Sequence, residues 1–291
     1  GCDYENKRRR KEVIMSGIAS DTQNFTKIQD FLKQVNKKDI LFEQYTASFL
    51  ERRIEVRLRK LGVNSYAQYL HTLQTDTNEV IALSKEMMIN VTHFFRDKAL
   101  WDEFATKIVP KIIKQKKLSV SNTIKILSAG CSDAEEATSI AICFLENPGL
   151  GNIKLEIECR DISEKIITQA KHAVYLKEQF REMPEKYLHK YFETQPNQTF
   201  KTKSAITQLF HFIQSDLLKD SLNGPYDLIF CRNTVIYFSV EAKSALYGKF
   251  YDKLVEEGYL ILGKTELLQG PFREKFVAEN PKERIYRKTT F

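Results

Sequence analysis

The sequence predicts an all-α segment followed by an α/β fold with a doubly wound, mostly parallel sheet. Glycine and proline are nearly absent from residues 20–118, where apolar residues recur three and four positions apart, as in amphipathic helices. From residue 123 onward, short apolar runs alternate with helical patterns. At residues 124–145 an apolar run, a turn of small residues and an alanine-rich helix follow one another directly. That order opens a nucleotide-binding βαβ unit, in which the turn approaches a ligand.

The N-terminal part divides into a tail, a helical domain and a linker. Residues 1–19 include a run of basic residues and are expected to be a solvated tail, whereas residues 20–105 form the helical domain. Residues 106–122 contain a lysine-rich stretch, which suggests a linker between domains. The apolar spacing predicts helices over 25–32, 45–61, 65–73, 78–90 and 101–113.

Residues 123–291 form the second domain, with strands expected over 123–128, 155–160, 209–213, 226–231, 259–263 and 284–288. Helices are expected over 134–146, 163–172 and 240–256. Residues 185–208 interrupt the alternation with two short strand-like stretches on either side of Pro196-Asn197. We expect these stretches to form a small antiparallel β insert at the rim of the sheet.

Composition argues against several classes of protein. Hydrophobic residues make up 42% of the chain and charged residues 29%, which is ordinary for a globular protein. No apolar run approaches the roughly 18 residues of a membrane span, so we expect no direct membrane insertion. The five cysteines form no C-x-x-C pair. This pattern favours reduced thiols in a cytoplasmic protein without a metal site. We also expect the protein to be a monomer.

The positive charge of the chain is concentrated in its N-terminal part. Residues 1–120 hold 22 Lys and Arg and 15 Asp and Glu, whereas the rest of the chain is neutral. Two interpretations stay open for the cations of the predicted helix 45–61: a solvated helix face, or a docking surface for an acidic partner, which is a protein or a nucleic acid. These cations are Arg52, Arg53, Arg57, Arg59 and Lys60, and Glu51 and Glu55 are the acids on the same helix.

Polar residues follow several of the predicted strands, and ligands bind at the carboxyl ends of strands in open α/β sheets. Each polar residue also has a simpler interpretation, since Ser132 and Glu135 match an S-x-x-E capping box and Asp161 could cap the next helix. Together they favour a site on one rim. The strand ends are Ser128-Ala129-Gly130-Cys131, Arg160-Asp161 and Cys231-Arg232-Asn233, with Asp216-Leu217 before the fourth strand and Tyr237 after it.

The chemistry of this rim indicates a nucleoside-like cofactor. The first turn contains neither G-x-G-x-x-G nor G-x-x-x-x-G-K-[ST], so it would not cradle a pyrophosphate or triphosphate well. Asp161 stands at the position that commonly holds ribose hydroxyls. An acid for ribose without a phosphate loop suggests S-adenosylmethionine.

Four motifs make the chain resemble the CheR family, the chemotaxis receptor glutamate methyltransferases. The similarity covers roughly residues 20–290, and the C-R-N block is the most family-specific motif. In family order the motifs are Asn90-x-Thr92-x-Phe94-Phe95-Arg96, Ala129-x-Cys131-Ser132-x-x-Glu135-Glu136-x-x-Ser139, Asp161-Ile162-Ser163 and Ile229-Phe230-Cys231-Arg232-Asn233-x-x-Ile236-Tyr237-Phe238.

The resemblance implies a helical N-terminal domain, a Rossmann-like class I methyltransferase domain and a β-subdomain that helps to dock the receptor. It implies catalytic positioning by Arg96 and Tyr237. The first turn departs from the family's usual C-S-T-G-E-E-P-Y-S, because Ala134 stands where glycine is usual and Thr138 where an aromatic ring is usual. Cofactor binding is implied for Asn90, Thr92, Arg96, Glu136, Asp161, Asp216, Leu217, Arg232 and Asn233.

The expected activity is therefore methyl transfer from S-adenosylmethionine, leaving S-adenosylhomocysteine, to glutamate carboxylates of a chemoreceptor. The acidic, helical signalling domain of that receptor would meet the basic helix 45–61. Two alternatives stay open. One is a catalytically impaired, CheR-like signalling module, which the altered first turn motivates. The other is a nucleic-acid methyltransferase; it lacks support because C-R-N stands in place of an N/D-P-P-Y/F turn.

Overall fold

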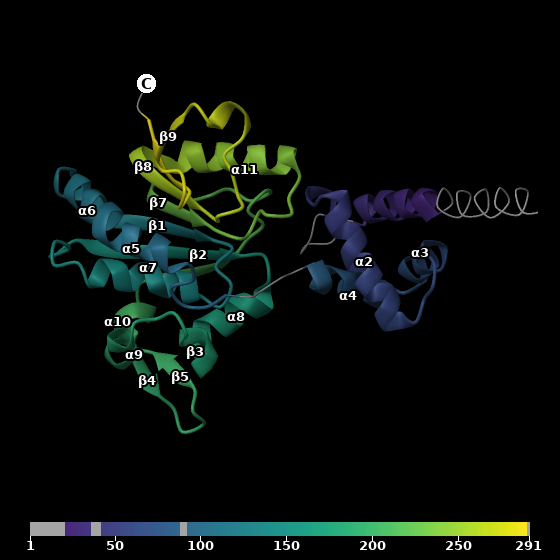
Figure 1. Cartoon of the computed structure of the whole chain (residues 1–291), viewed down its shortest axis with the longest axis horizontal. Helices are drawn as coiled ribbons and strands as arrows, with labels where there is room; N and C mark the ends of the chain where they lie inside the picture. Colours follow the sequence, from purple (N-terminus) through teal and green to yellow (C-terminus); the bar gives the residue numbers. More distant parts are fainter. Residues whose placement is uncertain (1–20, 36–41, 88–91, 290–291) are drawn as a thin grey trace, which may run out of the picture. The chain divides into compact units, whose positions relative to one another are not determined.

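The computed structural model describes residues 21–35, 42–87 and 92–289, and the chain divides into two compact units (Figure 1). The first unit holds the described residues up to 87 together with Tyr237–Ser239. The second unit holds the described residues from 92 onward apart from those three.

The first unit is all-α, as the apolar spacing predicts. A helix at 21–34 precedes the short 3₁₀ turn η1 (Phe42–Gln44), and the helices α2 (Ala47–Leu61), α3 (Tyr66–Thr75) and α4 (Thr77–Met87) follow. Gly62 ends α2 in the left-handed conformation (φ 66°), which glycine adopts without a steric cost. Apolar side chains from all of these elements form one core, including Ile28, Phe49 and Leu83.

The second unit is built on a seven-stranded sheet in the order β6-β2-β1-β7-β8-β10-β9. The first five strands are parallel, and β10 pairs antiparallel with both β8 and β9. The strand order reverses between β1 and β7, which is the switch point where ligands bind in such sheets. The strands are β1 (Thr123–Ala129), β2 (Lys154–Asp161), β6 (Phe210–Gln214), β7 (Tyr226–Cys231), β8 (Leu254–Leu262), β9 (Phe276–Asn280) and β10 (Ile285–Lys288).

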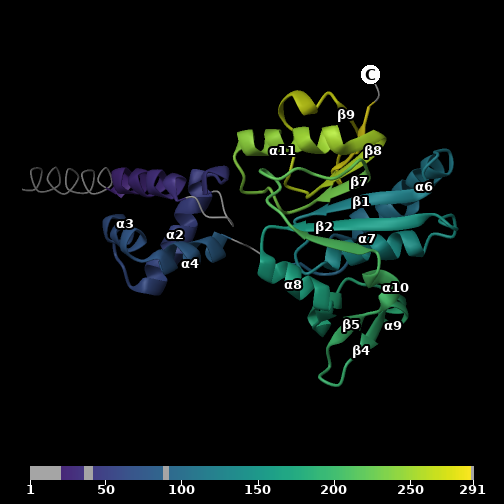
Figure 2. The same ribbon diagram turned by 180° about the vertical axis from the view of Figure 1, so that it is seen from behind.

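Helices cover both faces of this sheet. Figures 1 and 2 show α11 (Val240–Lys253) on one side and α7 (Glu135–Leu145) on the other, and α8 (Glu164–His172) contacts β2 and β6. A 3₁₀ turn, η4 (Gly270–Phe272), lies against α11. The expected Rossmann-like fold behind an all-α domain is confirmed. The strand β9 has no counterpart among the expected strands.

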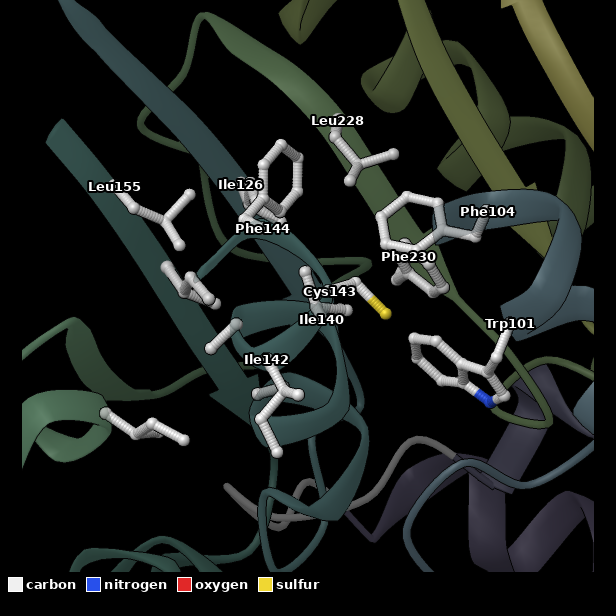
Figure 3. Packing of buried hydrophobic residues seen from close by; sticks show 14 of the residues in the cluster. Trp101, Phe104, Ile126, Ile140, Ile142, Cys143, Phe144, Leu155, Leu228 and Phe230 are labelled. Atoms are coloured by element: carbon white, nitrogen blue, oxygen red, sulfur yellow. The ribbon is translucent and has the colours of Figure 1, made fainter. Parts of the chain in front are cut away.

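Residues 98–117, which were expected to end the helical domain and to form most of the linker, belong to the second unit. They form α5 (Lys98–Glu103), the π-helical segment η2 (Phe104–Ile108) and α6 (Val109–Lys117). Trp101 stacks on Phe230 with ring centroids 5.6 Å apart, and Phe104 packs edge-on against the same ring at 5.1 Å (Figure 3). These large apolar side chains need a core to cover them, so the segment packs on the sheet instead of linking two domains.

The expected antiparallel insert is present as a three-stranded sheet in the order β3-β5-β4. It starts earlier than residue 185, because its first strand is β3 (Val174–Tyr175), followed by the 3₁₀ turn η3 (Lys177–Phe180). A strand of two residues is too short to show a period, which explains why the sequence pattern does not reveal it. The remaining elements are α9 (Glu185–Tyr191), β4 (Phe192–Thr194), β5 (Phe200–Thr202) and α10 (Ser204–Thr207).

Candidate active site

The turn after β1 is held against the end of β2. The backbone N–H groups of Gly130 and Cys131 both donate to the carbonyl of Arg160, at 2.8 and 2.9 Å. Gly130 has φ +76°, and a Cβ at this position would lie 2.3 Å from Oγ1 of Thr234. Only glycine therefore fits here, since the turn passes directly against the loop that follows β7.

Ala134 occupies the N-cap position of α7 in the left-handed conformation (φ 68°). The S-x-x-E capping box is absent, because no side chain caps this helix and Oγ of Ser132 has no partner among the described residues. The methyl group of Ala134 is fully buried in the core of the second unit. It therefore does not project from the rim toward a bound cofactor.

Asp161 joins the ends of the first two strands. Its Oδ2 accepts from the backbone N–H of Ser132 at 3.1 Å, and its Oδ1 accepts from that of Ser163 at 3.1 Å. Ser163, and not Asp161, caps α8, accepting from Ile166 N at 3.3 Å. Burial raises the pKa of Asp161, against the lowering effect of its backbone hydrogen bonds. The helix-capping interpretation of Asp161 is therefore wrong, and the carboxylate stands at the rim beside the first turn.

Two adjacent acids at the start of α7 have different surroundings. Glu136 accepts from Nη1 of Arg232 at 3.1 Å, and burial raises the pKa of Glu136 while Arg232 lowers it. Glu135 is fully buried and accepts from Nε2 of Gln179 at 2.6 Å, with Oε2 unpartnered among the described residues. Burial raises the pKa of Glu135 to about 7. Glu136 thus belongs to a charged cluster, whereas Glu135 lies beneath the rim.

Arg232 is the centre of that charged cluster. Its side chain is only 2% exposed, and it pairs with the carboxylates of both Asp97 and Glu136. Lys264 also lies near Asp97, with Nζ 3.6 Å from Oδ1. Asp97 was not among the expected site residues, because it lies just outside the Phe-Phe-Arg motif, directly after Arg96. Its partner Arg232 lies in another motif far along the chain, and the fold brings the two together.

The loop after β7 is fixed by a second acid that the sequence did not single out for the site. Glu266 is 1% exposed and accepts from the backbone N–H of Asn233 at 3.0 Å, of Val235 at 2.9 Å and of Gly263 at 2.6 Å. Asn233 itself has φ 58°. These bonds hold the C-R-N turn in a conformation that an L-residue adopts at a steric cost.

The turn after β6 presents an acid with a free oxygen atom. Oδ1 of Asp216 accepts from Leu218 N at 2.9 Å, whereas Oδ2 is buried without a hydrogen bond within the described residues, with Lys219 Nζ 4.0 Å away. Nζ of Lys249 donates to the carbonyl groups of Leu217 and Leu218. The expected Asp216-Leu217 pair is thus held from α11.

The Phe-Phe-Arg motif forms a tight turn in the second unit. Its first expected residue, Asn90, lies outside the described residues, and Thr92 is half-buried. Arg96 is half-buried, and its carbonyl accepts from Trp101 Nε1 at 2.8 Å and from Arg232 Nη1 at 3.4 Å. The motif therefore contacts Arg232 of the C-R-N turn in two ways, through the backbone carbonyl of Arg96 and through the neighbouring side chain of Asp97.

Tyr237 belongs to the first unit, unlike Arg96. Its ring stacks on Phe49 of α2 with centroids 4.0 Å apart and planes 5° from parallel. Its carbonyl accepts from Thr46 N at 2.8 Å. The guanidinium of Arg52 lies 5.7 Å from the ring centroids of both Phe49 and Tyr237. The aromatic ring is thus fixed beside an expected partner-binding cation.

The cations of α2 are not equivalent. Arg57 donates Nε and Nη2 to the buried carboxylate of Glu79 at 2.9 and 2.7 Å, and Lys60 pairs with Glu86 at 2.7 Å. The acids expected to pair with these cations were Glu51 and Glu55 of the same helix. In the structure the partners of Arg57 and Lys60 come instead from α4. Arg52 and Arg59 are exposed, and Arg53 lies over the ring of Phe49 at 5.1 Å.

The rim fits a nucleoside carrying a cationic sulfur and an amino-acid group. Several buried polar atoms have no hydrogen-bond partner in the described part of the chain, and most are acceptors. The ribose hydroxyls, the adenine amino group and the amino-acid ammonium of S-adenosylmethionine are donors, and its carboxylate would accept from an arginine. These unpartnered atoms are Ser132 Oγ, Asp133 Oδ1, Asp216 Oδ2 and Arg232 Nε.

Within residues 21–35, 42–87 and 92–289, no helix is both long and apolar enough to pass through a bilayer. The same residues contain no group of three or more His, Cys, Asp or Glu side chains placed to hold a metal ion.

A doubly wound sheet with an acid after its second strand and a charged cluster at its switch point fits a class I, S-adenosylmethionine-dependent methyltransferase. The chain belongs to the CheR methyltransferase family. The model described as "CheR methyltransferase, SAM binding domain" matches residues 90–284, and "CheR methyltransferase, all-alpha domain" matches residues 23–88. The cofactor is therefore S-adenosylmethionine.

Curated relatives cover most of the chain. The chemotaxis protein methyltransferase of Borreliella burgdorferi is 29% identical over 227 residues, covering 76% of this chain and 80% of that protein. Chemotaxis protein methyltransferase 2 of Vibrio cholerae is 28% identical over 258 residues, covering 87% of this chain and 88% of that protein. An uncharacterised 104.1 kDa protein of Rhodobacter capsulatus is 31% identical over 233 residues, covering 79% of this chain and 24% of that protein.

Proposed function

We propose that this enzyme transfers a methyl group from S-adenosylmethionine to glutamate carboxylates in the signalling domain of a chemoreceptor, forming methyl esters. The observation that carries the proposal is the cluster of Arg232, Asp97 and Glu136 at the β1–β7 switch point, close to the turn that Asp161 holds. Relatives that cover most of the chain are named chemotaxis protein methyltransferases.

The proposed reaction does not require the protein to remove a proton from its substrate. S-adenosylmethionine, when bound, supplies an electrophilic methyl group on a sulfonium. A glutamate carboxylate is already ionised at neutral pH, so no general base is needed. The residues of the chain then have to orient the carboxylate and exclude water.

We assign orientation of the carboxylate to Arg96 and Tyr237, and cofactor binding to the acids and the C-R-N turn. The stacking of Tyr237 on Phe49 supports its role, because the stacked ring face and the hydrogen bond to the Tyr237 carbonyl together restrict the orientation of this residue. Asn90, Thr92, Glu136, Asp161, Asp216, Leu217, Arg232 and Asn233 remain the proposed cofactor-binding residues.

The partner surface that we propose is the exposed side of α2. Fewer cations are available there than the sequence suggests, because two of them form ion pairs within the first unit. Arg57 and Lys60 are neutralised by Glu79 and Glu86, so Arg52, Arg53 and Arg59 are the cations with the greatest capacity to meet acidic receptor helices. Such contacts weaken as salt rises. The free thiols among the described cysteines fit a reducing compartment, and we place the enzyme in the cytoplasm as a monomer.

The test is transfer of a labelled methyl group from S-adenosylmethionine to receptor signalling fragments, with RNA and no substrate as parallel samples. We expect label on the receptor fragment, released by mild base as a methyl ester should be, and mapped to glutamate by peptide mass spectrometry. Label on RNA alone would support a nucleic-acid methyltransferase. Cofactor binding without transfer to any fragment would support a catalytically impaired signalling module.

A further inference from the structure

The segment from Tyr175 to Glu182, here called the strap, connects the small sheet to both cofactor turns. Its aromatic residues surround Phe94 of the Phe-Phe-Arg motif. The ring of Phe94 lies 4.6 Å from that of Phe180 and 4.8 Å from that of Tyr175, centroid to centroid. Phe94 is fully buried. The first aromatic residue of the motif is therefore part of the core of the small sheet.

The strap also holds the first turn. The hydroxyl of Tyr175 donates to the carbonyl of Asp133 at 2.7 Å, and Nε2 of Gln179 donates to Glu135 at 2.6 Å. Both acceptors belong to the stretch between β1 and α7. The position of that stretch thus depends on the strap as well as on β2.

The Phe-Phe-Arg turn is strained, and the strap supplies two of its backbone contacts. Phe95 has φ 54° and Asp97 has φ 70°. Left-handed residues persist where surrounding contacts over-determine them. Phe94 N donates to the carbonyl of Gln179 at 3.0 Å, and Asp97 N donates to Oε2 of Glu182 at 3.1 Å. Phe95 N is held from α7, by Oγ of Ser139 at 3.0 Å.

Glu182 is itself held in place by His93. Oε1 of Glu182 lies 2.7 Å from Nε2 of the imidazole, and Nη2 of Arg181 lies 2.7 Å from Nδ1. An arginine can only donate, so Nδ1 is the acceptor and Nε2 carries the hydrogen that Glu182 accepts. One carboxylate thus binds a ring that is 6% exposed and the backbone of Asp97.

We propose that Glu182 is a positioning residue of the S-adenosylmethionine site. It fixes the left-handed backbone at Asp97, so that the carboxylate of Asp97 faces and pairs with Arg232. Glu182 acts through Asp97 and does not contact the cofactor. Its own side chain is 37% exposed, so its contribution to folding stability is small.

The test is the affinity of the full chain for S-adenosylhomocysteine, measured by calorimetry, with urea unfolding as a second readout. Glu182→Ala is expected to weaken binding about tenfold without moving the unfolding midpoint. Glu182→Gln keeps an acceptor for Asp97 N and is expected to stay within about threefold of wild type. The matched control is Glu178→Ala, an exposed glutamate in η3, which should leave affinity unchanged.

A double-mutant cycle separates positioning from a general structural role. In an Asp97→Asn background, Glu182→Ala should change affinity by less than about twofold, since the carboxylate that it orients is gone. A full tenfold loss in that background would overturn the proposal, and so would unchanged affinity in Glu182→Ala alone. Failure of Glu182→Ala to fold, or an equal loss in Glu182→Gln, would also overturn it. No receptor is used, so these outcomes are independent of the proposed glutamate substrate.

Discussion

Two arginine–carboxylate pairs in this enzyme, each with one buried partner, have similar chemistry and different surroundings. Arg57 and Glu79 join α2 to α4, two regular helices, through bidentate hydrogen bonds of 2.9 and 2.7 Å. Arg232 and Asp97 join two irregular turns, and Asp97 sits in the left-handed conformation (φ 70°). The first pair connects two regular helices. The second pair connects two turns whose backbone is strained.

The difference distinguishes a pair that stabilises a fold from a pair that shapes a site. Five non-glycine residues with positive φ cluster in the rim motifs: Phe95, Asp97, Ser132, Ala134 and Asn233. In the described residues of the first unit, the positive-φ residue is Gly62, where the conformation has no steric cost. Breaking the Arg57–Glu79 pair should therefore destabilise the first unit, and removing a charge from the rim should lower cofactor affinity.

The largest expected effect is the loss of Glu79. Glu79→Ala leaves the Arg57 guanidinium and the fully buried Tyr69 hydroxyl without their acceptor. Breaking a buried pair in this way typically costs 3–5 kcal/mol. Trp101 is the single tryptophan and belongs to the second unit. In urea, circular dichroism should detect early loss of helix, while Trp101 fluorescence keeps its midpoint.

The control for this prediction is Glu86→Ala, which removes the Lys60 pair at the surface, where Lys60 is 55% exposed. It should cost no more than about 1 kcal/mol. Equal losses in the two variants, or a shifted Trp101 midpoint in Glu79→Ala, would contradict a purely fold-stabilising role.

The next effect concerns the buried acid beneath the rim. Burial raises the pKa of Glu135 to about 7, above roughly 4.3 in the unfolded chain. The stability that its protonation provides is complete below pH ~4.3 and is lost as pH rises through ~7, amounting to roughly 4 kcal/mol. Glu135→Gln should therefore be more stable than wild type at pH 8 and equal to it at pH 4, by Trp101 fluorescence in urea. Glu164→Gln, at an exposed position in α8, should show no such divergence, and an equal gain at both pH values would refute the assignment.

A smaller effect is expected at the rim itself. Asp161→Asn keeps one acceptor for the backbone of Ser132 or Ser163 and removes the charge. Loss of a charged acceptor should weaken S-adenosylhomocysteine binding by about tenfold to a hundredfold. Calorimetry measures the affinity, and Trp101 fluorescence in urea checks that the second unit remains folded. Full affinity in this variant would contradict the ribose-binding role.

The smallest effect is expected at Ala134. Its methyl group is 0% exposed and packs in the core, so replacing it with hydrogen should leave cofactor affinity within about twofold. Ala134→Gly relieves the left-handed strain and loses a buried methyl group, two terms of about 1 kcal/mol with opposite signs. A tenfold gain in affinity, by the same calorimetry, would show instead that the methyl group obstructs the cofactor.

The sequence predicts most of this architecture because its signals are local. Apolar runs and turns locate the parallel strands, and acid placement after β2 locates Asp161. The prediction of a capping box at Ser132 and Glu135 is wrong. The conformation of that turn depends on hydrogen bonds to the carbonyl of Arg160, which lies on another strand. Asp97 could not be assigned from its own motif, since its partner Arg232 is distant in sequence. The Arg57–Glu79 pair could not be predicted for the same reason, because its acid comes from another helix.

The most direct test of the account is one calorimetric titration with S-adenosylhomocysteine, applied to wild type, Glu86→Ala and Asp161→Asn under identical conditions. We predict equal binding to wild type and Glu86→Ala, and binding at least about tenfold weaker to Asp161→Asn. Absence of heat with the wild-type chain at high ligand concentration would contradict it, as would equal affinity in all three proteins.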